Sequence, residues 1–164
     1  MTKEQYLKIS EPFRRDSKKA ACMRFANQLC TVICYIGYAL LLIGRIILRD
    51  VWFWRVLLIP AVAFIILSIV RKRINAPRPY EVWQITPLIK KDSEGKSFPS
   101  RHVFSAAIIA MAVLSVHLPG GIILLVAAIV LSWCRVIAGV HFIKDVVTGL
   151  VIGVAAGLVG FFII

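Results

Sequence analysis

LCTVICYIGYALLLIGRIIL, residues 29–48, is the stretch that decides the fold of this chain. Only Thr31, Tyr35, Tyr38 and Arg45 interrupt its run of apolar side chains. A helix of about 20 residues rises about 30 Å, which is the thickness of the hydrocarbon core of a bilayer. The stretch therefore predicts a helix that spans a membrane.

The composition of the whole chain agrees with a membrane protein. Of its 164 residues, 60% are hydrophobic, and the mean hydropathy is +0.85. The net charge is +12, from 20 Lys and Arg against 8 Asp and Glu. A chain this apolar leaves little soluble surface for nucleic acid, so we expect no nucleic-acid partner. Membrane lipids with anionic headgroups, or a phosphorylated substrate, are the partners that the charge favours.

Four more apolar runs follow, at residues 51–70, 103–118, 120–140 and 146–164. Pro119, Gly120 and Gly121 separate two of these runs and predict a tight turn. The sequence thus predicts an all-α, multi-pass transmembrane helical bundle of about five spans. We expect an integral protein of the cell (plasma) membrane.

Residues 1–25 form a basic N-terminal arm ahead of a membrane-embedded domain at residues 26–164. Tyr6, Ile9 and Phe13 recur at intervals of three and four, which permits an amphipathic helix on the membrane surface. A solvated, poorly ordered arm is the alternative.

The only long polar stretch between apolar runs is residues 71–101, with eight basic and three acidic residues. Near its end stands KSFPSRH, residues 96–102. Pro99 and Ser100 are residue types that start helices, and the first turn of a helix binds phosphate through unpaired N–H groups. His102 would lie beside that phosphate. A plain capped helix with a surface histidine is the alternative.

Asp145 follows His141 by four residues, at the head of the last apolar run. On a helix this spacing lets the carboxylate accept a hydrogen bond from one imidazole nitrogen while the other points outward. Such an imidazole can act as a nucleophile or a base. The alternative is an interfacial charge beside a histidine. Arg135 argues against it, because an arginine inside a span usually has a partner or a ligand.

Three blocks of this sequence together resemble the signatures of the type 2 phosphatidic acid phosphatase and vanadium haloperoxidase superfamily. Arg135, His141 and Asp145 have the spacing of its third signature. Residues 99–102, PSRH, are similar to its second signature, which has glycine where this chain has Arg101. Residues 75–79, NAPRP, resemble its first, in which a lysine stands seven positions before the arginine that is Arg78 here. Arg71 occupies that position and Lys72 is one residue out of register, so either can fill it.

The resemblance implies a membrane lipid phosphatase that works through a phosphohistidine. His141 would attack phosphorus while Asp145 orients it, and His102 would protonate the leaving oxygen and later activate water. The implied phosphate-binding residues are Arg78, Arg135, Ser100 and either Arg71 or Lys72. No metal and no cofactor are expected, and the sequence itself has no carboxylate cluster near the histidines.

The substrate implied is a lipid phosphate or pyrophosphate, of the phosphatidic acid, phosphatidylglycerol phosphate or polyprenyl phosphate class. Arg101 would be an additional cation that suits a second phosphate, or else it only tethers the loop to headgroups. The rival hypothesis is a non-catalytic membrane protein that binds anionic lipid through the same basic loop. The side of the membrane that the site faces stays open.

Small residues at steps of four follow each proposed catalytic histidine or its partner: Ala106 and Ala110 after His102, and Gly149, Gly153 and Gly157 after Asp145. Such stripes let helices approach closely, which would bring His102 and His141 together. Generic membrane packing is the alternative. His117 is expected to have no catalytic role.

Overall fold

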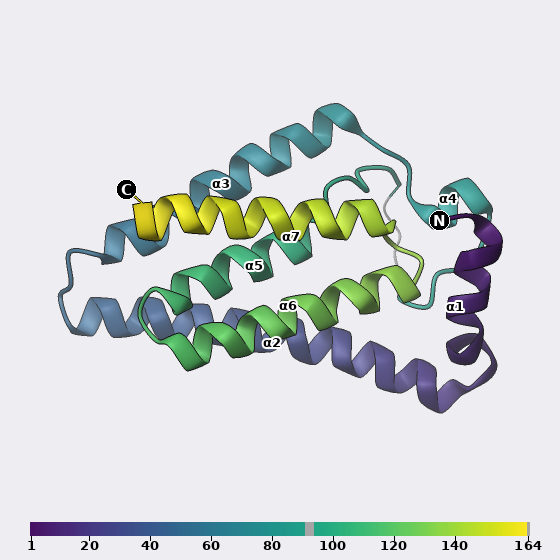
Figure 1. Cartoon of the computed structure of the whole chain (residues 1–164), viewed down its shortest axis with the longest axis horizontal. Helices are drawn as coiled ribbons and strands as arrows, with labels where there is room; N and C mark the ends of the chain where they lie inside the picture. The colour runs from purple at the N-terminus through teal and green to yellow at the C-terminus, as the bar shows by residue number, and fades with distance from the viewer. Residues whose placement is uncertain (91–93, 164) are drawn as a thin grey trace.

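The computed structural model describes residues 1–90 and 94–163 and consists of helices joined by loops (Figure 1). Along the chain the elements are α1 (Lys3–Arg15), α2 (Ser17–Ile47), α3 (Phe53–Ile74), α4 (Pro79–Trp83), α5 (Arg101–Leu114), α6 (Leu118–Ile137), α7 (Ile143–Leu158) and the π-helix η1 (Val159–Ile163). The long helices run side by side, and the short helices α1 and α4 lie at one end of them. The predicted all-α fold is confirmed.

Four segments are long and apolar enough to cross a membrane: Ser17–Ile47, Phe53–Trp83, Leu118–Ile137 and Ile143–Ile163. The second contains α3, residues 75–78 and α4, and the fourth contains α7 and η1. The fifth predicted span corresponds to α5, which has only 14 residues and rises about 21 Å. The prediction of five full-length spans is therefore corrected to four candidate spans and one shorter apolar helix. The helix ends with Ser115 as its C-cap, and α6 starts at Leu118 with His117 as its N-cap.

The core of the bundle is α5, which contacts α2, α3, α6 and α7. One side of it packs with Cys30 and Cys34 of α2 and with apolar residues of α6. Another side packs with Val56 and Leu67 of α3 and with Phe161 of η1. Because neighbouring helices cover α5, its length does not have to match the thickness of a bilayer.

The turn before α6 differs from the prediction. Pro119 and Gly120 lie inside the first turn of α6, where proline's missing N–H is not needed. His117 is the N-cap, and its Nδ1 accepts a hydrogen bond from the Gly120 N–H at 3.0 Å. His117 lies at the end of α5 opposite to His102, so its observed role is to cap a helix.

Of the two alternatives for the N-terminus, the structure has the helix. Thr2 and Gln5 form a capping box at the start of α1. Asp16 then caps α2 by accepting hydrogen bonds from the N–H groups of Lys18 and Lys19, at 2.8 and 3.3 Å. Residues 17–25, which the sequence analysis assigned to the arm, are therefore the first turns of α2.

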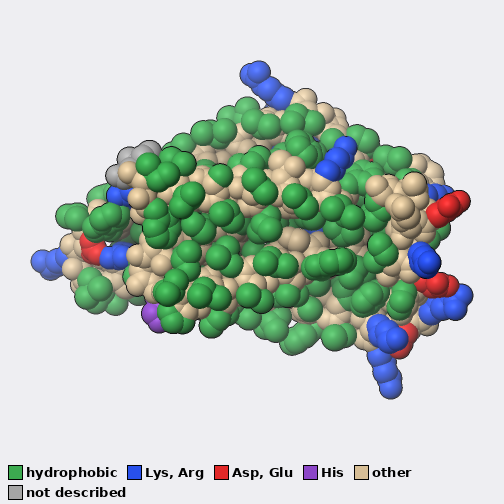
Figure 2. All heavy atoms as spheres, viewed as in Figure 1, with side chains coloured by type: hydrophobic (Ala, Val, Ile, Leu, Met, Phe, Trp, Pro, Cys, Tyr) green, Lys and Arg blue, Asp and Glu red, His purple; other side chains and the backbone are tan. Residues whose placement is uncertain are grey.

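The polar segments gather at one end of the bundle. α1, α4, the described residues of the polar loop (84–90 and 94–100) and the loop at residues 138–142 lie toward the end shown on the right of Figure 1. On the face drawn in Figure 2, hydrophobic side chains cover the flank of the bundle, and most charged side chains lie at that same end. At the opposite end Arg45 pairs with Asp50 in the turn between α2 and α3. The N-terminus, the polar loop and the loop at residues 138–142 thus lie toward the same end of the bundle.

Candidate active site

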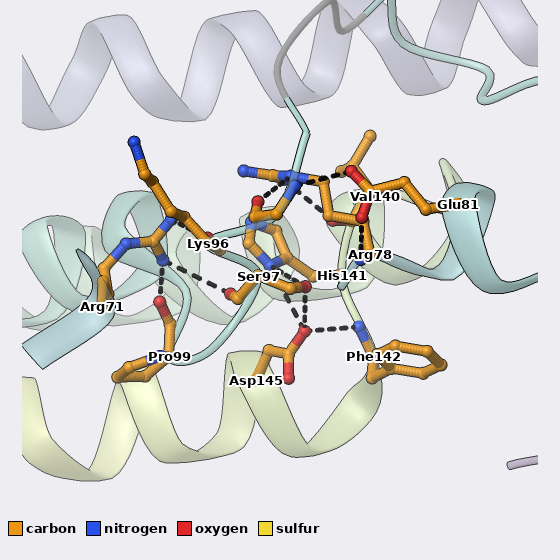
Figure 3. A network of polar contacts seen from close by, with 11 residues as sticks. Arg71, Arg78, Glu81, Lys96, Ser97, Pro99, Val140, His141, Phe142 and Asp145 are labelled. Carbon is orange, nitrogen blue, oxygen red and sulfur yellow. Dashed lines mark hydrogen bonds and ion pairs between the residues drawn. The ribbon is translucent and has the colours of Figure 1, made fainter. Parts of the chain in front are cut away.

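His141 lies in the loop between α6 and α7, held by Asp145 and Ser97 (Figure 3). Its side chain is 2% exposed, and its Nδ1 is 3.5 Å from Asp145 Oδ2 and 3.4 Å from Ser97 Oγ. Ser97 donates a hydrogen bond to the same Asp145 oxygen. With Nδ1 facing this pair, Nε2 is the nitrogen that remains for a substrate.

The spacing of His141 and Asp145 had suggested that both residues lie on one helix, but only Asp145 lies on a helix. α7 begins at Ile143, and Phe142 is its N-cap. Asp145 caps the helix by accepting a hydrogen bond from the Phe142 N–H at 3.0 Å. This cap turns the Asp145 carboxylate toward Phe142, so His141 contacts it from the loop.

Arg71 holds the polar loop against the end of α3. Its guanidinium donates hydrogen bonds to the carbonyl oxygens of Lys96, Ser97 and Pro99, and its side chain is buried. Lys72, the other candidate for the first-signature position, is exposed. Burial and contacts therefore distinguish the two residues.

Arg78 connects the polar loop with the loop that carries His141. Its Nε donates to the Gly95 carbonyl at 2.9 Å and its Nη1 to the Val140 carbonyl at 3.1 Å. Glu81 braces both sides by accepting hydrogen bonds from the N–H groups of Arg78 and Gly95, at 2.8 and 2.7 Å. Arg78 is 4% exposed, so this cation is fixed beside the His141 loop.

Ser100 and Arg135 each bury a hydrogen-bond donor that has no partner among the residues the structure describes. The atoms are Ser100 Oγ and Arg135 Nε, and both residues are buried. The Ser100 backbone N–H, by contrast, donates to the Asp145 carbonyl at 2.8 Å. Leaving a buried donor unpaired costs about 1–3 kcal/mol, so a ligand oxygen would stabilise either one. Asp145 Oδ1 is also buried without a partner in this part of the chain, but it can only accept.

His102 and Arg101 lie at the start of α5, on its α2 and α3 side. With Tyr35, Phe64 and Ser105 they line a cavity of about 90 Å³. His102 is half-buried, whereas Arg101 is exposed and places its guanidinium 5.4 Å from the centre of the Phe64 ring. Of the second-signature residues, Ser100 is therefore buried, whereas Arg101 and His102 line this cavity.

The electrostatic surroundings keep His141 neutral. Burial, reinforced by the positive charges of Arg78 and Arg135, lowers the pKa of His141 to about 4, although Asp145 opposes the shift. A neutral imidazole keeps the lone pair that attacks an electrophile. Arginines nearby attract an anionic substrate to that lone pair.

Side chains of the types that bind metal ions do not cluster in the described part of the chain. No group of three or more His, Cys, Asp and Glu side chains there is arranged to hold a metal ion. Arginine guanidinium groups are instead the cations that this site offers to an oxyanion.

Comparison with known proteins identifies the family. The family model of the PAP2 superfamily matches residues 52–164. The chain belongs to the PAP2 superfamily. The resemblance inferred from the three sequence blocks is thereby confirmed, and all three blocks lie inside the matched region of this PAP2 chain. No curated protein sequence matches it.

The solved structures that are similar to this PAP2 chain include two membrane proteins. One is LpxE of Aquifex aeolicus, with 28% sequence identity over 82% of this chain and 84% of that one, and a TM-score of 0.64. The other is a transmembrane PAP2-type phosphatidylglycerolphosphate phosphatase of Bacillus subtilis, with 23% identity over 94% and 90% of the two chains and a TM-score of 0.62. Their similarity supports the membrane-bundle fold.

Sequence reasoning missed Ser97 as a site residue of this PAP2 chain. Its partner Asp145 is 48 positions away, and no spacing rule links a loop serine to a carboxylate at that separation. The only sign of Ser97 in the sequence was that it lies near Ser100 in the basic stretch. Of the other predicted residues, the structure brings Arg71, Arg78, Ser100, Arg135 and Asp145 to the surroundings of His141. Lys72 is exposed, and His102 and Arg101 line the cavity on the α2 and α3 side of α5.

Proposed function

We propose that this PAP2 protein is an integral-membrane phosphatase that hydrolyses a lipid phosphate or pyrophosphate through a phosphohistidine on His141. One observation carries the proposal: a buried, neutral imidazole is held by Asp145 and Ser97 next to the buried cations Arg78 and Arg135, and Arg135 has an unpartnered donor, Nε. Its location in the cell membrane is part of the proposal.

The first half of the reaction transfers the phosphoryl group to the enzyme. His141 Nε2 attacks phosphorus, a P–N bond forms, and the bond from phosphorus to the leaving oxygen breaks. His102 gives its proton to that oxygen, so the dephosphorylated lipid leaves neutral at this position. In the second half His102 takes a proton from water, the resulting hydroxide attacks phosphorus, and the P–N bond breaks to release inorganic phosphate.

Arg78, Arg135 and Ser100 are assigned to the non-bridging oxygens of the phosphoryl group. Charge on these oxygens changes as the transition state forms, so fixed donors aimed at them lower the barrier. The unpartnered Ser100 Oγ and Arg135 Nε support this assignment. Arg71 is assigned to the first-signature position in preference to Lys72, because it is buried and its guanidinium shapes residues 96–99.

A lipid substrate is supported by an apolar groove next to His102. The groove lies between α2, α3 and α5 and has a volume of about 380 Å³; its lining residues include Tyr35, Tyr38, Leu57, Pro60, Ala61, Phe64, Ser105, Ile108 and Ile109. Tyr35, Phe64 and Ser105 also line the small cavity at His102 and Arg101. A hydrocarbon chain in the groove would thus place its phosphate at the start of α5.

The rival hypothesis, a non-catalytic protein that binds anionic lipid, needs only the basic loop. It gives no reason to bury His141 with Asp145 and Ser97, although taking a carboxylate out of water costs free energy. In the catalytic hypothesis the contacts with Asp145 and Ser97 orient the imidazole of His141 for attack. That hypothesis therefore accounts for more of the described contacts.

Phosphate release by the purified protein in detergent or proteoliposomes tests the proposal. The substrates are phosphatidic acid, phosphatidylglycerol phosphate, and a polyprenyl phosphate and pyrophosphate. We expect turnover of at least one of them, unaffected by chelator and inhibited by vanadate, which adopts the five-coordinate geometry of the transition state. No release from any of the four, or a requirement for a divalent ion, would contradict the proposal.

A further inference from the structure

The N-terminal helix α1 lies across the loop that carries His141, at the right-hand end of Figure 1. Tyr6 of α1 reaches this loop, and Phe13 packs against the cluster that includes Ala138 and Val140. The side chain of Tyr6 is 1% exposed, and its hydroxyl donates a hydrogen bond to the Ile137 carbonyl at 3.2 Å. α1 therefore contacts the loop through a buried side chain, although it is the first helix of the chain.

Donors from other segments hold three carbonyl groups in and next to the His141 loop. The Ala138 carbonyl accepts from the Leu88 N–H at 3.0 Å, and the Val140 carbonyl accepts from Arg78 Nη1 at 3.1 Å. Tyr6 supplies the third bond, to the last residue of α6. The three donors come from three separate segments, so each restrains the loop independently.

Gly139 shows how closely Tyr6 fits the loop. Its φ is +74°, a conformation that side chains other than glycine rarely adopt. A Cβ at this position would overlap the Tyr6 hydroxyl. The loop therefore has room for Tyr6 only because residue 139 has no side chain.

Arg14 fixes the hydroxyl of Tyr6 in its turn. Arg14 Nη2 donates to the Tyr6 hydroxyl at 3.1 Å and to the Thr86 carbonyl at 2.9 Å, and Arg14 Nε donates to Ser10 Oγ at 3.1 Å. Because the Tyr6 oxygen accepts from Arg14, its own proton is directed to the Ile137 carbonyl. Arg14 also joins α1 to the polar loop, which carries Ser97.

An aromatic chain extends the same contact to the residue after His141. The Tyr6 ring lies 5.1 Å from the Trp83 ring, and Trp83 meets the Phe142 ring edge to face at 5.2 Å. Offset and edge-to-face rings at these distances attract one another. α1 thus braces the His141 loop on both sides of the histidine.

We propose that Tyr6, held by Arg14, is a positioning residue for His141. The inference rests on the proposed function, since it assumes that His141 is the nucleophile. His141 has no helix of its own, and the contact with Asp145 at 3.5 Å leaves it dependent on the path of its loop. Misplacing a reacting group by about 1 Å can slow a reaction about a hundredfold, so the loop's restraints are part of the site. Tyr6 lies outside the region 52–164 that the family model matches.

Tyr6→Phe is the variant that tests the proposal, because it keeps the buried ring and removes only the hydroxyl. The matched control is Ser115→Ala, which removes a hydroxyl that donates to the Ala112 carbonyl at 2.8 Å at the other end of α5. Both variants lose one side-chain bond to a backbone carbonyl. We expect Tyr6→Phe to lower kcat about tenfold with KM within about twofold of wild type, and Ser115→Ala to change neither.

The pH profile gives a second readout, which a purely structural role would not move. A loosened loop admits water to His141, so its pKa should rise and the acid limb of kcat/KM should move to higher pH in Tyr6→Phe. Arg14→Met should shift both readouts in the same direction. Adding it to Tyr6→Phe should cost little more, because the two residues act through one hydroxyl.

The outcomes separate this proposal from the proposed function. If His141→Ala abolishes phosphate release and Tyr6→Phe keeps wild-type kcat and an unshifted pH profile, the positioning role is rejected and the mechanism stands. An equal loss of kcat in Tyr6→Phe and Ser115→Ala would also reject it, because the loss would then be general. If His141→Ala releases phosphate normally, the proposed function itself fails.

Discussion

Gly149 of α7 and Ser100, the N-cap of α5, meet backbone to backbone. A methyl group added to Gly149 would lie 2.6 Å from the Ser100 carbonyl oxygen. Farther along the same helix, a methyl group on Gly153 would lie 2.7 Å from the Ala107 Cβ. The stripe of small residues therefore lets α7 approach α5 closely, as predicted, and it brings the helix that starts at Arg101 next to Asp145.

Gly149→Ala should separate these two helices. Overpacking of this kind typically costs about 1–3 kcal/mol, and here it also displaces Ser100 from Asp145, so we expect both stability and kcat to fall. Gly44→Ala in α2 is the control, because a Cβ there meets nothing within 4 Å and should stabilise the helix by about 0.5–1 kcal/mol. Denaturant unfolding in detergent measures both. Equal stability of the two variants would contradict close packing at Gly149.

Arg71→Lys tests the loop anchor. An ammonium group cannot reproduce a planar guanidinium that reaches three carbonyls, and each hydrogen bond from a charged group is worth about 1.5–3 kcal/mol. We expect kcat/KM to fall at least tenfold. Lys72→Met removes the neighbouring exposed charge and should leave kcat unchanged. The opposite ranking would place Lys72 in the first-signature position.

Arg101→Gly tests whether the additional cation serves a second phosphate. Arg101 stands above Phe64 at the opening beside His102, where a second phosphate of a lipid pyrophosphate could reach it. On that hypothesis the substitution costs pyrophosphate substrates about 1.5–3 kcal/mol in transition-state binding and monophosphates much less. Equal losses in kcat/KM on both classes would reject the second-phosphate role, and no loss on either would leave Arg101 as a tether of the loop.

The pH dependence of stability follows from His141. Its pKa is about 4 in the folded protein, against about 6.5 when unfolded, so the unfolded state binds more protons between these values. Stability should therefore fall by roughly 2–3 kcal/mol as the pH drops from 6.5 to 4. In His141→Gln that slope should be much smaller. Unfolding curves for both proteins across this range measure it, and identical slopes would mean that His141 does not titrate at low pH.

Much of the fold and of the candidate site could be predicted because its signals are local. Apolar runs of about 20 residues predict spans directly, and Arg78, Arg135, His141 and Asp145 stand at spacings that a family signature preserves. The length of α5 was different, because Val116 and Leu118 extend the apolar run past the end of the helix, which has Ser115 as its C-cap. The position of the turn between α5 and α6 was also misjudged. With His117 as the N-cap, Pro119 fits in the first turn of α6 and does not form the turn itself.

Contacts between distant segments could not be predicted. Ser97 and Asp145, or Tyr6 and Ile137, are paired only because the bundle brings their segments to the same end. No periodicity in the sequence encodes such a pair. Arg71 was ambiguous with Lys72 until burial distinguished them, because neighbouring residues on a helix point about 100° apart.

The most direct test of the central claim is to trap the phosphoenzyme. Purified protein is mixed with a lipid substrate that carries a radiolabelled phosphate, quenched in alkali within one turnover, and the labelled residue is mapped. We expect the label on His141 in wild type and none in His141→Ala. His102→Ala should acquire the label slowly, when the leaving group is good, and then retain it, because it lacks the group that activates water. Label that persists in His141→Ala, or near-native turnover by that variant, would contradict the account.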